Sequence, residues 1–243
     1  MGGASPALPC VILAGGLGTR MRHVAPDLPK FLLPVAGRPF ADHQLAWLAG
    51  QGVRSVVLCV GYRAAAVADH VGDGSRWGLA VRVVDEGPAL RGTGGALRHA
   101  LDAGALPERF WALYGDSYLP IDLAPVQRAF ERSGAEALMT VLHNEDRWDR
   151  SNARLDGGLV VRYEKGHSDP AAAGLRHVDY GLSILGAGVV AELVPAGVPF
   201  DLADVFRRLS AEGRLAGHEV AERFYEVGSP AGLRDLTDHL AGR

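Results

Sequence analysis

The chain has 243 residues, of which 48% are hydrophobic and 22% charged, and its formal net charge at pH 7 is −3. This length buries a sizeable core, and the absence of a basic excess argues against a nucleic-acid partner. No apolar run approaches membrane-spanning length, and the start M-G-G-A-S-P-A-L-P lacks the basic and apolar regions of a signal peptide. We therefore expect a cytoplasmic protein with no membrane partner.

In the first half, short apolar runs alternate with segments of helical periodicity. Strands are predicted at 10–14, 53–60, 79–84 and 110–114. Helices are predicted at 39–49, 62–71 and 95–101. Continuous apolar runs between helices are typical of a parallel sheet that is buried on both faces. Cys10 and Cys59 lie within such runs, which indicates buried thiols and not a disulfide or a metal site.

The second half continues with a more varied pattern. Helices are predicted at 123–131, 201–211 and 230–240, and strands at 137–142, 159–163, 178–185 and 224–227. No repeat or linker interrupts the chain. The prediction is a single α/β domain over 1–243, a three-layer α/β/α, Rossmann-like fold around a mixed, mostly parallel sheet.

The segment after the first strand indicates an anion site. It reads L-A-G-G-L-G-T-R from residue 13, and Lys30 follows ten residues later within D-L-P-K. Glycines let main-chain N–H groups converge on an anion, and Arg20 and Lys30 add full charges. Lys30 and Lys165 are the only lysines of the chain. The loop is neither a dinucleotide fingerprint nor a P-loop, and alone it is also compatible with an ordinary strand-to-helix turn.

Three acidic positions lie at or just after the ends of predicted strands. Gly115-Asp116 comes after strand 110–114, Glu164-Lys165 after strand 159–163, and Glu226 lies in Y-E-V-G-S-P. Carboxylates at the carboxyl ends of strands lie where such sheets bind ligands. The alternatives are a simple turn at Asp116, a surface ion pair at Glu164-Lys165 and a solvated strand end at Glu226.

Together these motifs resemble the sugar-1-phosphate nucleotidyltransferases, whose signature reads L-A-G-G-x-G-T-R-L-x-P-x-T-x-x-x-P-K-x-x-x-P-V. The resemblance covers nearly the whole chain, with the motifs in the family's order. It implies the nucleotidyltransferase type of the fold, with catalysis by Arg20 and Lys30. It also implies a nucleotide-binding set: Leu13, Ala14, Gly15, Gly16, Gly18, Thr19, Glu86, Gly94 and Gly95. The last three belong to E-G-P-A-L-R-G-T-G-G-A, which resembles the stretch that wraps the base and ribose.

The same resemblance implies an Mg²⁺ ion on Asp116 and Glu226, and a sugar-phosphate site further along the chain. That site would use Gly115, Glu164, Lys165, Asp179 and Gly181. Two positions depart from the family pattern, because Glu226 stands for the usual aspartate and Asp179 for the usual asparagine. Asp179 either favours a polyol-rich or amine-bearing sugar or is a tolerated structural change.

The implied reaction joins a nucleoside triphosphate and a sugar 1-phosphate into a nucleotide sugar and pyrophosphate. Residues 1–123 would then serve mainly the nucleotide and 124–243 mainly the sugar phosphate. A-G-G-L-G-T-R, D-L-P-K and V-x-G-R-P-F look most like the D-glycero-α-D-manno-heptose 1-phosphate guanylyltransferases, which favours GTP and a heptose or mannose-like sugar. The alternatives are uridylyl or thymidylyl transfer to another sugar 1-phosphate and a non-catalytic regulatory protein that binds nucleotide sugars. A homodimer is a further expectation.

Overall fold

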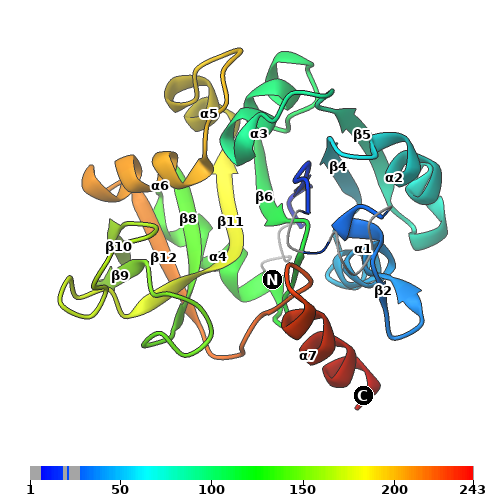
Figure 1. The fold of residues 1–243 in the computed structure, drawn as a ribbon. Coiled ribbons are helices and arrows are strands. Elements are labelled where there is room, and N and C mark those ends of the chain that lie inside the picture. The colour runs from blue at the N-terminus through cyan, green and yellow to red at the C-terminus, as the bar shows by residue number, and fades with distance from the viewer. Residues whose placement is uncertain (1–6, 19–20, 22–27, 243) are drawn as a thin grey trace, which may run out of the picture.

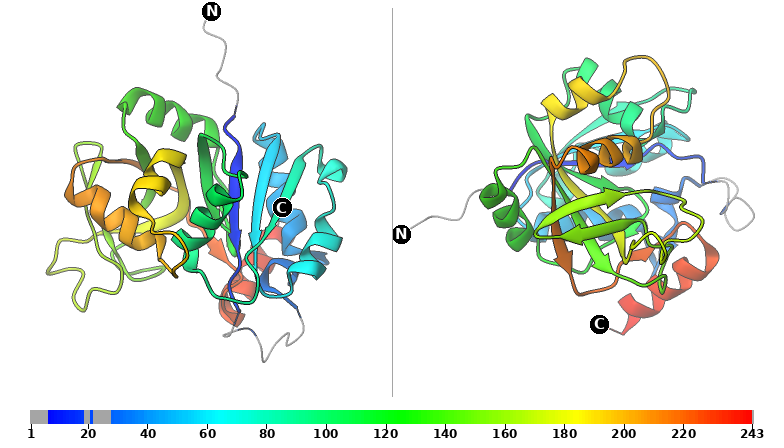
Figure 2. Two further views of the ribbon diagram at one scale, coloured as in Figure 1. Left: turned by 90° about the horizontal axis from the view of Figure 1, so that it is seen from above. Right: turned by 90° about the vertical axis from the view of Figure 1, so that its left-hand side faces the viewer.

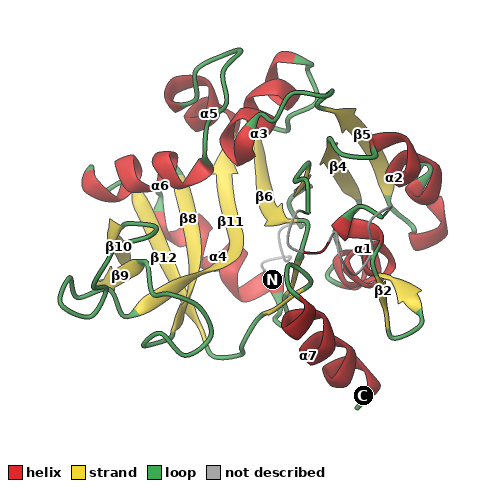
Figure 3. Cartoon of the chain, viewed as in Figure 1, coloured by secondary structure: helices red, strands yellow, loops and turns green. Residues whose placement is uncertain are grey.

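A computed structural model describes residues 7–18, 21 and 28–242. Their largest element is a nine-stranded sheet in the order β5-β4-β1-β6-β11-β8-β12-β10-β9. In chain order the strands are β1 (Cys10–Ala14), β4 (Ser55–Val60), β5 (Ala80–Asp85), β6 (Arg109–Tyr114), β8 (Ala137–His143), β9 (Ala153–Asp156), β10 (Leu159–Tyr163), β11 (His177–Gly186) and β12 (Leu215–Val220). Figure 3 shows the strands of both halves joined in one sheet through β6 and β11.

The half of the sheet built from the first 114 residues is parallel. Strand β1 pairs in parallel with β4 and β6, and β4 pairs in parallel with β5. Four of the five residues of β1 are buried, as expected for a strand covered on both faces. The carboxyl ends of these four strands therefore meet at one edge of the sheet.

The other half is mixed. Strand β11 runs antiparallel to both β6 and β8, whereas β12 is parallel to β8. The outer strands β10 and β9 pair antiparallel. Strands β8 and β12 thus run in the same direction as the four parallel strands, and the predicted mixed, mostly parallel sheet is confirmed.

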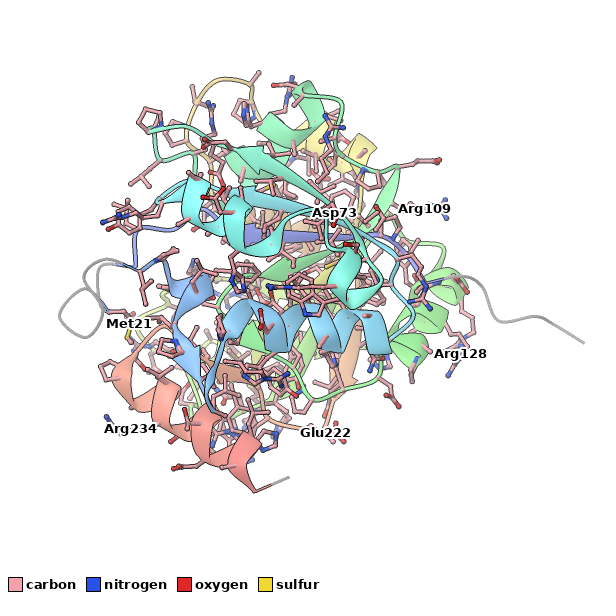
Figure 4. All side chains as sticks on the ribbon, turned by 90° about the vertical axis from the view of Figure 1, so that its right-hand side faces the viewer. Met21, Asp73, Arg109, Arg128, Glu222 and Arg234 are labelled. Atoms are coloured by element: carbon pink, nitrogen blue, oxygen red, sulfur yellow. The ribbon has the colours of Figure 1, made fainter. Side chains whose placement is uncertain are left out.

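Seven helices cover the two faces of the sheet (Figures 1 and 2). They are α1 (Phe40–Gly50), α2 (Ala64–Val71), α3 (Gly92–Asp102), α4 (Leu123–Ser133), α5 (Ala187–Leu193), α6 (Leu202–Ala211) and α7 (Pro230–Ala241). Buried side chains of α1, α2, α4 and α7 belong to one core cluster, and those of α3, α5 and α6 belong to a second. The side chains fill the space on both faces of the sheet (Figure 4).

Local chemistry explains where the last helices begin. The side chain of Asp201 caps α6 by accepting a hydrogen bond from the amide of Ala203. Ser229 caps α7 in the same way through the amide of Gly232, and Pro230 follows in the first turn, where its missing N–H costs nothing. Each cap fixes the residue at which its helix begins, and both helices begin close to segments that carry predicted site residues.

The predicted elements agree with the structure to within three residues at every boundary. The two buried cysteines are free thiols, as expected. Strands β9 and β12 and helix α5 were not predicted. Strand β12 reads L-A-G-H-E-V, where Gly217 breaks the apolar pattern; a Cβ there would collide with the side chain of Leu155. Its strand conformation comes from pairing with β8 and β10 on either side.

The start of α3 differs from its prediction in an informative way. The helix was predicted over 95–101, but Gly92, Thr93 and Gly94 already belong to α3 and form its first turn. The amides of Gly94 and Gly95 donate to the carbonyl of Phe200 at 2.9 and 3.0 Å. A Cβ on Gly94 would lie 3.1 Å from the Phe200 ring, so the absence of a side chain allows α3 to pack closely on the segment before α6.

Candidate active site

A cavity of about 490 Å³ opens at the carboxyl ends of the parallel strands. Its lining comes from the loop after β1, the residues around Lys30, the segment from the end of β5 to α3, and the end of β6. The lining residues are Leu13, Ala14, Gly15, Gly16, Leu17, Lys30, Phe31, Glu86, Leu90, Arg91, Gly92, Thr93, Ala96, Tyr114, Gly115 and Asp116. This edge is where open α/β sheets bind their ligands.

The loop after β1 is shaped by close approaches that only glycine permits. A Cβ on Gly15 would collide with the carboxylate of Glu86. Gly18 has φ +61°, and a Cβ there would lie 3.1 Å from Cγ of Lys30. The loop therefore packs between Glu86 on one side and Lys30 on the other. Thr19 and Arg20 lie outside the described residues, so their roles in nucleotide binding and catalysis stay predictions.

Lys30 and Asp116, which are 86 positions apart in the sequence, form an ion pair in the cavity. The Nζ atom of Lys30 lies 2.8 Å from Oδ2 of Asp116, and the two side chains are 20% and 30% exposed. Lys30 begins a short 3-10 helix, and the neighbouring Phe31 is buried against the ring of Phe40. This anchor places the lysine at the mouth of the cavity.

Asp116 is brought to the cavity by an equally tight contact between β6 and β1. It follows Gly115, whose amide donates to the carbonyl of Leu13 at 2.9 Å. A Cβ on Gly115 would lie 2.7 Å from Cβ of Ala14. Only glycine fits here, and the carboxylate that follows therefore lies directly beside the first-strand loop.

The second predicted metal ligand lies beside the first. The short strands β7 (Ser117–Tyr118) and β13 (Tyr225–Glu226) pair antiparallel, with Glu226 opposite Ser117. The amide of Val227 also donates to the carbonyl of Asp116 at 2.9 Å. Asp116 and Glu226 are therefore one step apart along the paired backbones, but Glu226 lies against Gly232 of α7 and, unlike Asp116, is not among the residues that line the cavity.

Asp116, alone or together with Glu226, has the donor chemistry for Mg²⁺, which uses one or two carboxylates and completes its shell with substrate phosphates and water. Among the residues that the structure describes, no group of three His, Cys, Asp or Glu side chains is placed to hold a metal ion.

Of the predicted sugar-phosphate residues, Gly115 lines the cavity, whereas Glu164, Lys165, Asp179 and Gly181 lie after β10 or in β11 and are not among its lining residues. Lys165 contacts Asp201, with Nζ 3.2 Å from Oδ2. Glu164 accepts from Arg162 at 2.7 Å, which holds the pKa of its carboxyl below the usual range. Gly181 has φ +89°, and a Cβ there would lie 3.1 Å from Oγ of Ser117 and 3.3 Å from the Tyr114 ring. Gly181 thus lets β11 approach the end of β6.

Asp179 is engaged by donors of the protein itself. Its carboxylate accepts from the Gly181 amide at 2.9 Å and from the hydroxyls of Tyr114 and Tyr163 at 3.3 and 3.4 Å. Burial raises the pKa of Asp179, although these donors oppose the shift. Because its oxygens already have donors, the contacts favour a structural role for the aspartate over direct recognition of an unusual sugar.

Glu86 differs from every other acidic residue of the cavity. Its side chain is 5% exposed, and its Oε1 atom has no hydrogen-bond partner in the structure. Burial raises the pKa of Glu86 to about 7, against the opposing effect of Arg91. A buried carboxylate oxygen without a donor is costly, so this group is well suited to receive N–H donors from a ligand.

The structure also places residues in the site that the sequence did not single out. Gly94 and Gly95, predicted to contact the nucleotide, face Phe200 and do not line the cavity, whereas Thr93, which directly precedes them, and Tyr114 of β6 do. Asp201 joins the site through Lys165 and Thr93. The only signal for Asp201 in the sequence is its position as the first residue of the predicted helix 201–211, which is equally typical of an ordinary cap.

Comparison with known proteins agrees with this geometry. Residues 10–218 match the family described as MobA-like NTP transferase domain. The N-acetylmuramate alpha-1-phosphate uridylyltransferase of Caulobacter vibrioides is 31% identical, covering 90% of this chain and 91% of that protein. The D-glycero-alpha-D-manno-heptose 1-phosphate guanylyltransferase of Campylobacter jejuni is 28% identical, covering 64% of this chain and 67% of that protein.

A solved structure shows the same fold over nearly the whole chain. HddC from Yersinia pseudotuberculosis superposes with a TM-score of 0.76 at 24% identity, covering 96% of this chain and 99% of its own. The fold is thus the nucleotidyltransferase type of α/β protein. The chain belongs to the family of MobA-like NTP transferases, and the curated relatives named above are sugar-1-phosphate nucleotidyltransferases.

Proposed function

We propose that the protein transfers a nucleotidyl group from a nucleoside triphosphate to a sugar 1-phosphate, releasing pyrophosphate. The observation that carries this proposal is the Lys30–Asp116 pair, 2.8 Å apart in the cavity beside the glycine loop of β1. At that point a cation and a carboxylate that binds a metal ion can neutralise the charge of the reacting phosphates. Residues 1–123 would serve mainly the nucleotide and residues 124–243 mainly the sugar phosphate.

The chemistry of the acceptor explains why the site needs charge and not a base. The second pKa of a phosphate monoester is about 6, so the attacking oxygen is already deprotonated at neutral pH. The main obstacle is the repulsion between two anions that must meet in line. Catalysis then depends on positioning and on neutralising charge.

Different side chains are proposed to neutralise the charge of different phosphates. Lys30 stabilises the charge that develops on the α-phosphate, and Lys165 holds the phosphate of the sugar. Arg20, outside the described residues, is proposed to stabilise the leaving pyrophosphate. Asp116 and Glu226 would hold Mg²⁺, which when bound neutralises phosphate oxygens. The amides of the loop 14–18 would contact the triphosphate.

For the base we propose guanine, because of Glu86. The Watson–Crick edge of guanine offers two adjacent donors, which an ionised carboxylate can accept together. Uracil and thymine present one donor between two acceptors, which suits a protonated carboxyl or an amide instead. The buried, unsatisfied Glu86 carboxylate thus favours GTP when it is ionised.

The variant Glu86→Gln is expected to reverse this preference. We expect the ratio of kcat/KM for GTP over UTP to fall about 10- to 100-fold, because a lost bidentate base contact corresponds to roughly 1–3 kcal/mol. Since the pKa of Glu86 is about 7, the wild-type KM for GTP should rise as the pH falls through neutrality and the carboxylate is protonated. The Gln variant should lose this pH dependence.

Steady-state kinetics with both nucleotides at several pH values would measure these effects. Glu131→Gln makes the same chemical change on an exposed position of α4 and serves as the control. An unaltered GTP/UTP ratio in Glu86→Gln would contradict the assignment of the base.

An activity panel tests the proposed function. Each of four nucleoside triphosphates is combined with each of several sugar 1-phosphates in the presence of Mg²⁺, and the release of pyrophosphate is measured. We expect the fastest turnover with GTP and a heptose or mannose-like 1-phosphate. Uridylyl or thymidylyl transfer to another sugar is the second candidate, favoured by the identity to the Caulobacter uridylyltransferase. A silent panel with intact nucleotide-sugar binding would instead support the non-catalytic regulatory protein.

Two further expectations concern the absence of a membrane partner and the oligomeric state. The described helices include none that is both long enough and apolar enough to cross a bilayer. A homodimer remains a proposal that sedimentation or light scattering can test.

A further inference from the structure

A polar cluster that reaches the cavity through Thr93 connects three segments that are distant in the sequence. Lys165 follows β10, Asp201 precedes α6, and Thr93 lies in the first turn of α3, where it lines the cavity. The Lys165 ammonium lies 3.2 Å from Oδ2 of Asp201. The hydroxyl of Thr93 donates to Oδ1 of the same carboxylate at 3.0 Å.

Asp201 is held in place independently of the lysine. Its Oδ1 atom also accepts from the Ala203 amide at 3.0 Å, as the cap of α6. Thr93 is itself fixed, because its Oγ1 accepts from the Leu202 amide at 2.9 Å. With Oδ1 engaged twice, Oδ2 is left for Lys165. Partial burial opposes ionisation, but the Ala203 amide and the Lys165 charge keep the pKa of Asp201 below its usual range, so the group is anionic at neutral pH.

The contact between Lys165 and Asp201 is one that a stronger anion can replace. The side chains of Lys165 and Asp201 are 63% and 47% exposed, and the distance of 3.2 Å is long for a charge-assisted hydrogen bond. Exposed pairs of this kind contribute little to stability. A phosphate dianion carries more charge than a carboxylate and presents several acceptor oxygens to the same ammonium.

We propose that Asp201 is a placeholder for the phosphate of the sugar substrate. Its carboxylate, which also accepts from the cavity-lining Thr93, holds the Lys165 ammonium in the free enzyme and releases it when the sugar phosphate binds. Asp201 is thus a positioning residue that competes with the substrate for one cation. This inference rests on the proposed function for the identity of the displacing anion.

The variant Asp201→Asn tests the competition directly. Asparagine is as good a helix cap as aspartate and can still accept from Thr93 and Ala203, so the fold should be unaffected. We expect the KM for the sugar 1-phosphate to fall about two- to five-fold, because an exposed ion pair no longer has to be broken. The KM for the triphosphate, kcat and Tm should not change.

Two matched variants separate competition from a general effect of charge. Asp204→Asn removes a carboxylate three positions further along α6, where it pairs with Arg207 at 2.9 Å, and should leave the KM unaltered. In a Lys165→Ala background, Asp201→Asn should lose most of its effect. An unchanged or increased KM for the sugar phosphate in Asp201→Asn overturns the inference.

Calorimetric titration with inorganic phosphate gives a readout that does not need turnover. The full-length Asp201→Asn protein should bind phosphate about two- to five-fold more tightly than the wild type, and the Lys165→Ala variants should show no such gain. If no substrate pair reacts with the wild type, the proposed function fails, while the titration still decides whether Asp201 competes for Lys165. Equal phosphate affinity in the wild type and Asp201→Asn rejects the placeholder role.

Discussion

Replacing Lys30 with alanine is expected to lower kcat about 10²–10³-fold, the usual effect of removing one preorganised charge from a reacting group. In the structure the Lys30 ammonium contacts Asp116 in the cavity, so the variant removes the cation and leaves a carboxylate facing the substrate phosphates. Pyrophosphate release at saturating substrates would measure the loss. The effect should fall mainly on kcat, because the charge acts most strongly as charge develops on the α-phosphate.

The same variant should remain folded. The Lys30–Asp116 pair is partly exposed, so its removal changes the free energy of unfolding by no more than about 1 kcal/mol. Lys30→Arg is the informative control, since it keeps the charge but replaces a compact ammonium with a planar fork that needs more room. We expect this variant to be intermediate. Near-normal turnover in a well-folded Lys30→Ala protein would show that the lysine does not act on the reacting phosphate.

Replacing Asp116 with asparagine is expected to have an effect of similar size by a different route. Asp116 is the carboxylate that follows β6 beside Glu226, and asparagine cannot supply the negative charge that favours a divalent cation. We expect a fall in kcat of about 10²–10³-fold and an activation curve shifted to higher Mg²⁺ concentration. Titrating Mg²⁺ against pyrophosphate release measures both changes.

Asp122→Asn, at the exposed start of α4, provides the control for Asp116→Asn and should leave the Mg²⁺ curve unaltered. Removing divalent ions with EDTA should abolish the wild-type activity, and Mg²⁺ should restore it. Glu226→Gln should shift the Mg²⁺ curve less, because Asp116 remains. An Asp116→Asn protein with a wild-type Mg²⁺ requirement would place the metal elsewhere.

Most of the fold could be predicted from local patterns. Buried parallel strands read as short apolar runs, and strand β1 begins and ends at the predicted residues. The outer, antiparallel strand β10 also begins and ends as predicted. The unpredicted elements lack such a signal. Helix α5 has only seven residues, and the polar sequence of β12 becomes a strand only because β8 and β10 supply its hydrogen-bond partners.

Part of the site could be anticipated for a similar reason. Residues that follow parallel strands gather at one edge of a sheet, so Asp116 was expected near the loop that begins at Gly15, whereas Glu86 was expected there only from the family resemblance. Contacts between segments far apart in the chain were not foreseeable. Thr93 and Asp201 are separated by 108 positions, and neither belongs to a motif that indicates their hydrogen bond.

The amino-acid sequence alone determined the alternation of strands and helices and the glycine-rich anion loop, because both are properties of neighbouring residues. It also determined the scarcity of lysine, which is a property of the composition. Only the tertiary structure decided that Lys30 meets Asp116, that Asp179 is already satisfied by two tyrosines, that the glycines of α3 pack on Phe200, and that Lys165 is held by Asp201. The physical reason is that burial and charge pairing depend on which segments the sheet brings side by side, and that is a property of the whole fold.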